Sequence, residues 1–482
     1  MGNAGSALQP PDVDDEISHR IARSAQTTQG TVVSTDGFAS WFTRCVDRVN
    51  QRVRRIPFGE LREWRFAAET GNLVHDSGRF FSVEGLTAVS DYGPVPAWTQ
   101  PIINQPEIGI LGILVKEFDG VLHCLMQAKA EPGNVGDVQL SPTVQATKSN
   151  YSRVHGGRAV PYLDFFRNPP PARVMADVLQ SEQGSWFFRK RNRNMIVEAD
   201  GDIEVGEDFC WLTIGQVNAL LTHDNLVNMD ARTVLSCFPL AGRGLRDLDG
   251  AASTPWGDAT YQSLSGTLGS AHATGEIGSW ITGSQSRHEI HTRLIPLREV
   301  TGWHRSRHEI AHELGVFFRV IAVDVEVAGR EVRRWAQPLL HPHEEGIVAF
   351  LAKRIDGVLH VLVNARVEPG YLDIVELAPT VQCTPGNYRH LRRADRPLFL
   401  DLVLGAKAEE IRFDTVLSEE GGRFYRARSR YLVVEVDDEA IPAEPPDYRW
   451  MTLYQLSGLL RHSHYVNVQA RTLIACLRSA WK

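Results

Sequence analysis

Hydrophobic and polar positions along the chain predict the order helix, strands, helices, and they predict it twice. Near the start, one face of a predicted helix carries Trp41, Phe42, Cys45, Val49 and Val53. Two apolar runs of strand length, 110–115 and 121–130, flank Asp119–Gly120, which is a strong hairpin signal. Residues 187–197 predict a further strand, in which arginines alternate with other residues.

The last part of each copy is predicted to begin with a helix. A Thr-x-x-Gln capping-box pattern at 213–216 precedes a predicted helix that ends near residue 223, and the same pattern recurs at 452–455. A last helix is predicted over 230–237. The class is therefore α+β, and the order of the strands is left open.

The chain contains two copies of one domain. The sequence Asp-Gly-Val-Leu-His at 119–123 recurs at 356–360, an offset of 237 residues (360 − 123). Towards both ends the offset becomes 239, as for Ala-Arg-Thr at 231–233 and 470–472, because of one short deletion and one short insertion. Repetition in the same order over this length indicates a duplicated domain of about 200 residues.

The repeat defines the expected boundaries. We predict two homologous domains, each a mixed β-sheet flanked by helices, over 37–240 and 276–482. The Gly-, Ala- and Ser-rich segment 241–275 is predicted to be a flexible linker. The polar segment 1–36 is predicted to be a disordered tail.

Composition and charge narrow the classes of function. The chain has 482 residues, of which 43% are hydrophobic, and a net charge of −7, which argues against a nucleic-acid partner. No apolar leader is visible at the start, and no apolar run is long enough to span a bilayer. The six cysteines are scattered, as expected of reduced thiols. We predict a cytoplasmic protein without a membrane segment.

The densest polar block of the first copy lies between residues 142 and 155. Its hydroxyls, amides, imidazole and cations suit hydrogen bonding to a sugar and its phosphates, and they comprise Gln145, Thr147, Lys148, Asn150, Tyr151, Arg153 and His155. The second copy keeps Gln382, Thr384, Asn387 and Tyr388. The alternative is a polar surface loop, but the recurrence favours a functional block.

A second block begins with Ser-Glu-Gln-Gly at 181–184. Glu182 is the candidate catalytic acid or base, and its alternative role is a salt bridge to a neighbouring arginine. If residues 187–194 are extended, one face carries Arg189, Arg191 and Arg193, which could pair with a diphosphate. The alternative is an edge strand protected by charge. The second copy keeps Glu419, Arg426, Arg428 and Arg430.

Other features carry weaker signals. Trp64 and Trp98 recur as Trp303 and Trp335, and a base or a sugar could stack on them, although core packing is the commoner role. His304, His308 and His312 have helical spacing, which an exposed helix explains without a metal. The sequence contains neither a G-x-G-x-x-G motif nor a P-loop, so we predict no cofactor and no metal.

Taken together, the blocks resemble the NDP-hexose 2,3-dehydratases of deoxysugar biosynthesis. The resemblance rests on Gln-Ala-Thr-x-x-Asn-Tyr at 145–151, Ser-Glu-Gln-Gly-x-x-Phe at 181–187 and the region 211–228, and it covers both copies. It implies a Nudix-like fold in each half, a homodimer, and thymidine-diphosphate 4-keto-6-deoxyglucose as substrate. The implied product is an unstable 3,4-diketo-2,6-dideoxy sugar nucleotide, which a separate 3-ketoreductase reduces on the way to antibiotic sugars.

The resemblance assigns expected roles. Loss of water needs a base at C3, donors for the C4 oxyanion and an acid for the departing hydroxyl. The candidate proton carriers are Tyr151, His155 and Glu182. The candidate substrate-binding residues are Trp64, Trp98, Gln145, Thr147, Lys148, Asn150, Arg153, Gln183, Arg189, Arg193 and Asn194, with Trp303, Trp335, Gln382, Thr384, Asn387, Tyr388, Glu419, Arg426 and Arg430 in the second copy.

Two alternatives from other classes stay open, and the copies are expected to differ. One alternative is a Nudix-type nucleotide-sugar hydrolase, although no Arg-Glu pair has the metal-binding continuation of that class. The other is a non-catalytic nucleotide-sugar binding protein. Since Lys148, His155 and Asn194 become Pro385, Arg392 and Tyr431, we predict that only the first copy performs chemistry.

Overall fold

The computed structural model describes residues 15–147, 160–242, 245, 254–327 and 334–479. The predicted alternation of elements is present in both halves. In the first half the helices are α1 (Asp15–Gln26), α2 (Thr35–Arg48), α4 (Asp164–Arg167), α5 (Ile214–Leu220) and α6 (Met229–Ser236). In the second half they are α7 (Pro255–Ser265), α8 (Thr274–Arg287), α9 (Leu400–Leu404), α10 (Leu453–Leu459) and α11 (Val468–Leu477).

Each half carries a large mixed sheet. In the first half the path is β10 (Val174–Ser181), β11 (Arg191–Glu198), β6 (Gly109–Phe118), β7 (Val121–Lys129) and β12 (Phe209–Thr213). Two short strands, β8 (Gln139–Ser141) and β9 (Val144–Ala146), pair with β7 and β6. Strands β11 and β6 run parallel, and the other neighbours are antiparallel.

The second half repeats this sheet with the same pairing. Its path is β22 (Ile411–Ser418), β23 (Arg428–Glu435), β18 (Gly346–Ile355), β19 (Val358–Arg366) and β20 (Glu376–Ala378), with β21 (Val381–Cys383) on β18 and β24 (Tyr448–Met451) on β19. Asp119 and Gly120 both have positive φ, as do Asp356 and Gly357, so the hairpin predicted between the two central strands is present in each half.

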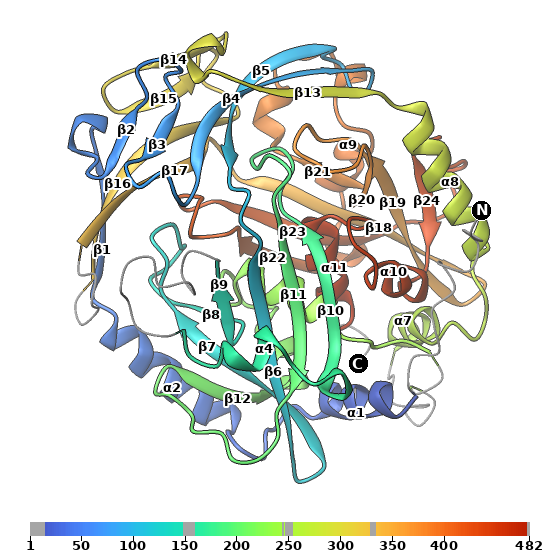
Figure 1. Ribbon diagram of the computed structural model, residues 1–482. Helices are drawn as coiled ribbons and strands as arrows, with labels where there is room; N and C mark the ends of the chain where they lie inside the picture. The colour runs from blue at the N-terminus through green and yellow to red at the C-terminus, as the bar shows by residue number, and fades with distance from the viewer. Residues whose placement is uncertain (1–14, 148–159, 243–244, 246–253, 328–333, 480–482) are drawn as a thin grey trace.

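Two smaller sheets exchange strands between the halves. In one, β2 (Trp64–Phe66), β3 (Leu73–His75), β4 (Ser82–Ser90) and β5 (Ala97–Asn104) of the first half take up β13 (Ile290–Ile295) of the second. In the other, β14 (Trp303–Arg305), β15 (Glu309–His312), β16 (Phe318–Val327) and β17 (Arg334–Pro342) take up β1 (Gln51–Ile56). Figure 1 shows both strands crossing over. The halves are therefore interlocked.

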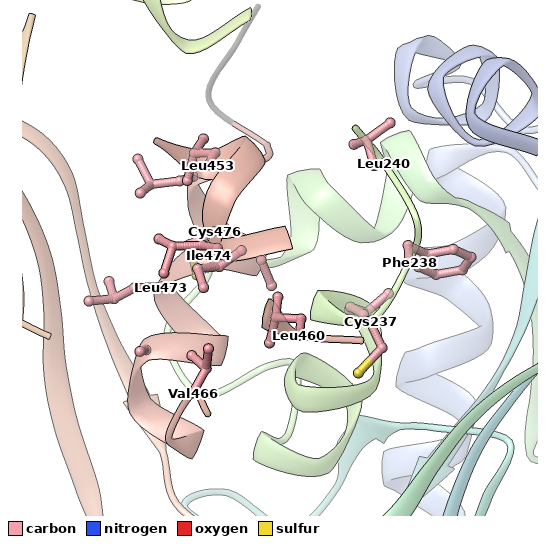
Figure 2. Packing of buried hydrophobic residues seen from close by; sticks show 14 of the residues in the cluster. Cys237, Phe238, Leu240, Leu453, Leu460, Val466, Leu473, Ile474 and Cys476 are labelled. Carbon is pink, nitrogen blue, oxygen red and sulfur yellow. The ribbon is translucent and has the colours of Figure 1, made fainter. Parts of the chain in front are cut away.

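The helices α6 and α11 join the halves at their centre. A continuous hydrophobic cluster includes residues of both halves, and Figure 2 shows part of it, with Cys237 and Phe238 from one half and Leu473 and Ile474 from the other. Two buried arginines cross this contact reciprocally. Arg232 donates to the Ser418 carbonyl and Arg471 to the Ser181 carbonyl, each at 2.6 Å. These bonds satisfy backbone acceptors that burial would otherwise leave unpaired.

The structure corrects two expectations about the segments outside the repeats. Residues 15–26 of the predicted disordered tail form α1, whose Ile21 and Ala22 are fully buried in the core. Residues 255–265 of the predicted linker form α7. The two helices are counterparts, because Ser24 and Ser263 both accept a bond from the first backbone N–H of the helix after the last strand. The repeat thus begins one helix earlier than the sequence pattern indicated.

Other boundaries shift by a few residues. Helix α2 ends at Arg48, so Val49 caps it and Val53 lies in β1, not on the helix. The strand predicted over 187–197 begins only at Arg191, in β11. The two capping boxes are confirmed. Within the described residues, no helix has the length and apolar character needed to cross a membrane.

Candidate active site

Glu182 follows β10 and lies on the first-half side of the contact between the halves. Its backbone N–H donates to the Lys190 carbonyl at 3.0 Å, which closes the loop between β10 and β11. Its Oε1 accepts a hydrogen bond from the Asn192 amide at 2.7 Å. Its Oε2 is buried and has no hydrogen-bond partner among the described residues. A buried carboxylate oxygen without a partner is costly, which is typical of a group that binds a ligand or a proton.

A cavity of about 110 Å³ lies against this carboxylate. Most of its wall comes from the first half, and a short segment of the second half completes it. The lining residues are Gln105, Gly109, Leu111, Lys129, Glu131, Gln145, Ala146, Thr147, Glu182, Phe187, Lys190, Asn192, Asp230, Glu420, Gly422 and Arg423. A wall with this many ionisable side chains is built for proton transfer and for polar ligands, not for an apolar cofactor.

Four carboxyl groups line the cavity, those of Glu131, Glu182, Asp230 and Glu420. Besides Glu182, the atoms Asp230 Oδ1 and Glu420 Oε2 are buried and lack a hydrogen-bond partner among the described residues. Burial raises the pKa of Asp230 well above its usual range, and the negative charges of Glu182 and Glu420 raise it further. Burial likewise raises the pKa of Glu420 to about 8. At neutral pH Glu420 therefore holds a proton that it can give to a ligand.

Two cations near Glu182 oppose the effect of burial on its pKa. Burial raises the pKa of Glu182, while the charges of Arg471 and Lys190 and the bond from Asn192 act against that rise. Burial lowers the pKa of Lys190 to about 8, and its ammonium donates to the Glu107 carbonyl. Burial thus raises the pKa values of Glu182, Asp230 and Glu420 alike, but the three carboxyl groups differ in their charged neighbours.

Gln145 is held in the wall by a chain of side-chain bonds. Its amide nitrogen donates to Glu131 Oε1 at 2.8 Å, and its carbonyl oxygen accepts from Asn228 at 3.2 Å. Lys129 pairs with the same Glu131 oxygen at 3.4 Å. Asn228 also caps α6, which begins next to Asp230. This chain fixes Gln145 and the start of α6 relative to each other.

Several candidate residues of the first polar block cannot be placed. Lys148, Asn150, Tyr151, Arg153 and His155 lie outside the described residues. Of the remaining candidates in that block, Gln145 and Thr147 line the cavity.

The arginine stripe does not face the cavity. Arg193 of β11 pairs with Asp177 of β10 through two bonds of 2.7 and 2.5 Å, and Arg430 pairs with Asp414 in the same way. Since side chains alternate along a strand, Arg193 points away from the face on which Asn192 lines the cavity. Arg193 and Arg430 are therefore engaged in ion pairs outside this cavity, and their predicted diphosphate contact stays a prediction. The alternative of an edge strand is wrong, because β11 lies between β10 and β6 and β23 lies between β22 and β18.

Two other candidates of the second block also lie elsewhere. Arg189 is exposed, stacks on the Phe188 ring at 5.0 Å and donates its backbone N–H to Gly370. Arg426 is its counterpart, with the Tyr425 ring at 5.4 Å and its backbone N–H on Gly133. Asn194 is buried but does not line the cavity.

The tryptophans have structural roles. Trp64 and Trp303 are buried in the core of the small sheets, so stacking on a ligand is wrong for both. Trp98 and Trp335 instead orient glutamines. Trp98 donates to Gln100 at 2.8 Å and Trp335 to Gln337 at 2.9 Å. These glutamines hold the turns that follow the two copies of the Ser-Glu motif, through the carbonyls of residues 185 and 422.

In the second half, the carboxylate equivalent to Glu182 is engaged by protein donors. Glu419, the counterpart of Glu182, accepts bonds from Ser429 at 2.9 Å, Tyr431 at 3.2 Å and Gln183 at 3.1 Å. Gln183 therefore belongs to the second-half site, not to the cavity beside Glu182.

The other second-half candidates are held in the same way. Gln382 bonds Glu368 at 3.0 Å and accepts from Asn467 at 2.8 Å, and Asn387 accepts from the backbone of Phe317 at 2.8 Å. Thr384 and Tyr388 flank and end a short 3₁₀ turn.

A larger groove of about 720 Å³ lies on the second half, but its chemistry is different. Its wall holds paired surface charges, among them Arg354 with Glu435 at 2.8 Å and Lys353 with Asp438 at 3.0 Å. Exposed ion pairs of this kind are common on solvated surfaces. We therefore assign the site to the smaller cavity, where the ionisable groups are buried.

Sequence reasoning missed six ionisable residues of the cavity: Lys129, Glu131, Lys190, Asp230, Glu420 and Arg423. A comparison of the two copies could have identified Lys190 and Asp230. At the repeat offset, Lys190 becomes Ala427 and Asp230 becomes Gln469, so the first half alone keeps these charges. The position of Glu420 and Arg423 could not be anticipated, because they reach the cavity from the other half.

Comparison with known proteins finds one family model that matches this chain twice. A family model described as NDP-hexose 2,3-dehydratase matches residues 35–238 and again 274–477. Three curated relatives are each named dTDP-4-dehydro-6-deoxy-alpha-D-glucopyranose 2,3-dehydratase. The relative from Saccharopolyspora spinosa is 51% identical over 96% of this chain and 95% of its own length. Those from Amycolatopsis orientalis and Streptomyces violaceoruber are 50% identical, over 98% and 93% of this chain and 96% and 98% of theirs.

Proposed function

The chain belongs to the NDP-hexose 2,3-dehydratase family, and from that premise we propose that it is a hydro-lyase acting on dTDP-4-dehydro-6-deoxyglucose. It removes water across C2 and C3 of the sugar and yields a 3,4-diketo-2,6-dideoxy sugar nucleotide for deoxysugar biosynthesis. The relatives of about 50% identity over almost the whole chain support this substrate.

The observation that supports the location of the chemistry is the cluster of buried carboxyl groups around the first-half cavity. Glu182, Asp230 and Glu420 each present an oxygen without a protein partner among the described residues. Dehydration next to a ketone needs several proton transfers in a site that excludes bulk water. We therefore place the reaction in this cavity and assign no chemistry to the second-half counterpart.

The residues divide the steps as follows. The C4 ketone acidifies the C3 proton, and we assign its removal to Glu182, which lines the cavity and has a buried Oε2 without a partner among the described residues. The charges of Arg471 and Lys190 act against the rise in the pKa of Glu182 that burial causes. The electrons of the C3–H bond form an enolate, whose C4 oxygen is stabilised by donors such as Gln145 or Lys190. The enolate then expels the C2 hydroxyl, which leaves as water after it takes a proton. Thr147 and Asn192 line the space around the sugar.

Other parts of the proposal follow from the family resemblance. Each half adopts a Nudix-like fold, the chain acts as a cytoplasmic homodimer, and a 3-ketoreductase consumes the product. The mixed sheet of each half, with one parallel pair among antiparallel neighbours, supports the proposed fold. The reaction is redox-neutral, and the proposal includes no cofactor and no metal. Among the described residues, no group of three or more potential ligands stands at metal-binding distance.

One incubation tests the function against its alternatives. Purified protein is mixed with dTDP-4-keto-6-deoxyglucose after dialysis against EDTA, and the products are analysed by mass spectrometry. Loss of one water from the sugar nucleotide is expected. Release of thymidine monophosphate that depends on an added divalent ion would instead identify a hydrolase. Tight binding without turnover would identify a binding protein, and either result would refute the proposal.

A further inference from the structure

A turn of the second half enters the first-half cavity. Gly133 of the first half donates its backbone N–H to the Gly421 carbonyl at 2.7 Å and accepts from the Arg426 N–H at 2.7 Å. A Cβ atom on Gly133 would lie 1.7 Å from the Phe424 carbonyl oxygen, so only glycine permits this approach. The backbones of the two halves are therefore in direct contact, and the turn has a fixed position.

The turn delivers the carboxyl group of Glu420. Its Oε1 accepts from the Gly422 N–H at 3.1 Å, and Gln337 holds the Gly422 carbonyl at 2.8 Å. Its Oε2 is buried and has no partner among the described residues, and the side chain lines the cavity together with Glu182. One oxygen is thus anchored while the other is left for a ligand.

Arg423 ties the same turn to the first half. Its Nε donates to Gln105 at 3.0 Å, its Nη1 donates to Gly422 at 2.8 Å, and its guanidinium stacks on the Phe81 ring at 4.2 Å. These contacts fix Glu420 from the side opposite to Gly133. Charges face Glu420 from every element around the cavity, namely Lys129, Glu131, Glu182, Lys190, Asp230 and Arg423.

We propose that Glu420, which the second half contributes, is the catalytic acid that protonates the departing C2 hydroxyl in the first-half cavity. This inference rests on the proposed function. The enolate electrons form the C2–C3 double bond and restore the C4 ketone, and the C2–O bond breaks with its electron pair on oxygen. That oxygen takes the carboxyl proton of Glu420 and leaves as water, and Glu420 becomes a carboxylate. Ketonisation of the resulting C3 enol then moves one proton from the C3 oxygen to C2.

The first half contributes no acid to the equivalent site of the second half at this position. At the position equivalent to Glu420, the first half contributes Gln183, whose amide donates to Glu419 at 3.1 Å. An amide can donate a hydrogen bond but does not give up a proton at this step. The turn at this position therefore supplies an acid to the first-half cavity but not to the second-half site.

A leaving-group experiment on the full-length chain tests the inference. Glu420→Gln keeps the size of the side chain, and we expect kcat with dTDP-4-keto-6-deoxyglucose to fall by about 10²- to 10³-fold with KM changed less than about threefold. A substrate analogue with fluorine in place of the C2 hydroxyl needs little acid assistance. With it, the variant should turn over within about tenfold of the unmodified protein, whereas Glu182→Gln should be inactive with both substrates.

The matched control is Glu376→Gln. Glu376 is a buried carboxyl of the second half that also reaches the first half, where it accepts from the Ser181 hydroxyl, but it lies outside the cavity. We expect its kcat to stay within about threefold. If Glu420→Gln does not fold, Glu420→Asp is used in its place. We expect a smaller loss of kcat with the hydroxyl substrate and again a faster turnover of the fluoro substrate.

Three outcomes overturn the inference: full activity of Glu420→Gln, equal losses with the hydroxyl and fluoro substrates, or an equal loss in Glu376→Gln. Full activity of Glu182→Gln would instead refute the proposed function, so the two failures are distinguishable.

Discussion

The cavity beside Glu182 and its counterpart beside Glu419 occupy equivalent places in the two halves, yet they differ in charge. In the first half, Glu182 has one donor, and its second oxygen has no hydrogen-bond partner within the part of the chain that the structure describes. In the second, three donors occupy Glu419. The repeat replaces Lys190, Asp230, Glu420 and Arg423 of the first cavity by Ala427, Gln469, Gln183 and Trp186.

The difference shows that two copies of one fold can carry different ionisable residues at the same place. Burying ionisable groups is unfavourable unless a ligand or a partner compensates them. The second half keeps buried carboxyl groups of its own, Glu368 and Glu376, but it has the buried Tyr371 and Tyr431 where the first has Asn134 and Asn194. Tyr371 accepts a hydrogen bond from Asn467 at 3.1 Å. The first half keeps its unfavourable charges because, in our proposal, they perform the chemistry.

The largest expected effect is a contrast between two equivalent substitutions. Glu182→Gln should lower kcat by about 10³-fold, since it removes the proposed base. Glu419→Gln should lower kcat by no more than a few-fold, because Glu419 bonds only to protein groups. Steady-state kinetics with dTDP-4-keto-6-deoxyglucose measures both. Equal losses would mean that the catalytic half is wrongly assigned.

A smaller effect on kcat is expected when Lys190 of the first-half cavity is replaced by alanine, the residue at the equivalent position of the second half. Lys190→Ala reproduces Ala427, and we expect a loss of about 10- to 100-fold in kcat, since an enolate donor and a cation beside Glu182 disappear. Lys190→Arg restores a charge and should recover part of the rate. A Lys190→Ala variant with unaltered kcat would exclude the lysine from the reaction.

Glu376 and its first-half counterpart Gln139 are expected to affect the thermal stability of the protein differently. Burial raises the pKa of Glu376 to about 8, whereas its first-half counterpart is Gln139. A carboxyl whose folded-state pKa is raised stabilises the fold fully below the unfolded pKa of about 4.3, and this contribution is lost as the pH rises through about 8. Glu376→Gln should therefore raise Tm by about 2–5 °C at pH 8.5 and leave it almost unchanged at pH 4.5. Calorimetric scans at the two pH values measure it, and an equal shift at both would contradict the cause given.

The smallest expected effect concerns binding. Both copies keep the Gln, Thr and Asn-Tyr positions of the first polar block, which predicts up to two nucleotide-sugar sites per chain, the second of them weak. Titration calorimetry with an unreactive thymidine-diphosphate sugar should resolve them, and Gln382→Ala should remove only the weaker site. A single site that is insensitive to Gln382→Ala would show that the second half binds no nucleotide sugar.

Local sequence patterns predicted much of the fold correctly. Asp119–Gly120 specified a hairpin because both residues adopt positive φ, and the Thr-x-x-Gln patterns at 213–216 and 452–455 specified helix starts through two mutual hydrogen bonds. The pattern at 15–26 was missed, because a short helix gains its stability from packing in the core and not from its own sequence.

The candidate site was predicted only in part. Glu182, Gln145 and Thr147 line the cavity and were identified from motifs. The ion pair of Arg193 was not predicted, because the strand begins at Arg191 and Asp177 lies on a neighbouring strand that the sequence does not identify. Lys190 and Asp230 could have been found from the differences between the copies.

The sequence by itself determined the duplication, the family and the chemical type of the central residues, because these depend on local patterns and on identity between positions. Only the tertiary structure decided which residues meet. The exchange of β1 and β13 and the contact of Gly133 with the turn at Gly421 bring Glu420 beside Glu182, although they are far apart in the chain. Such contacts result from the burial of whole surfaces between the halves, and no short segment of sequence encodes them.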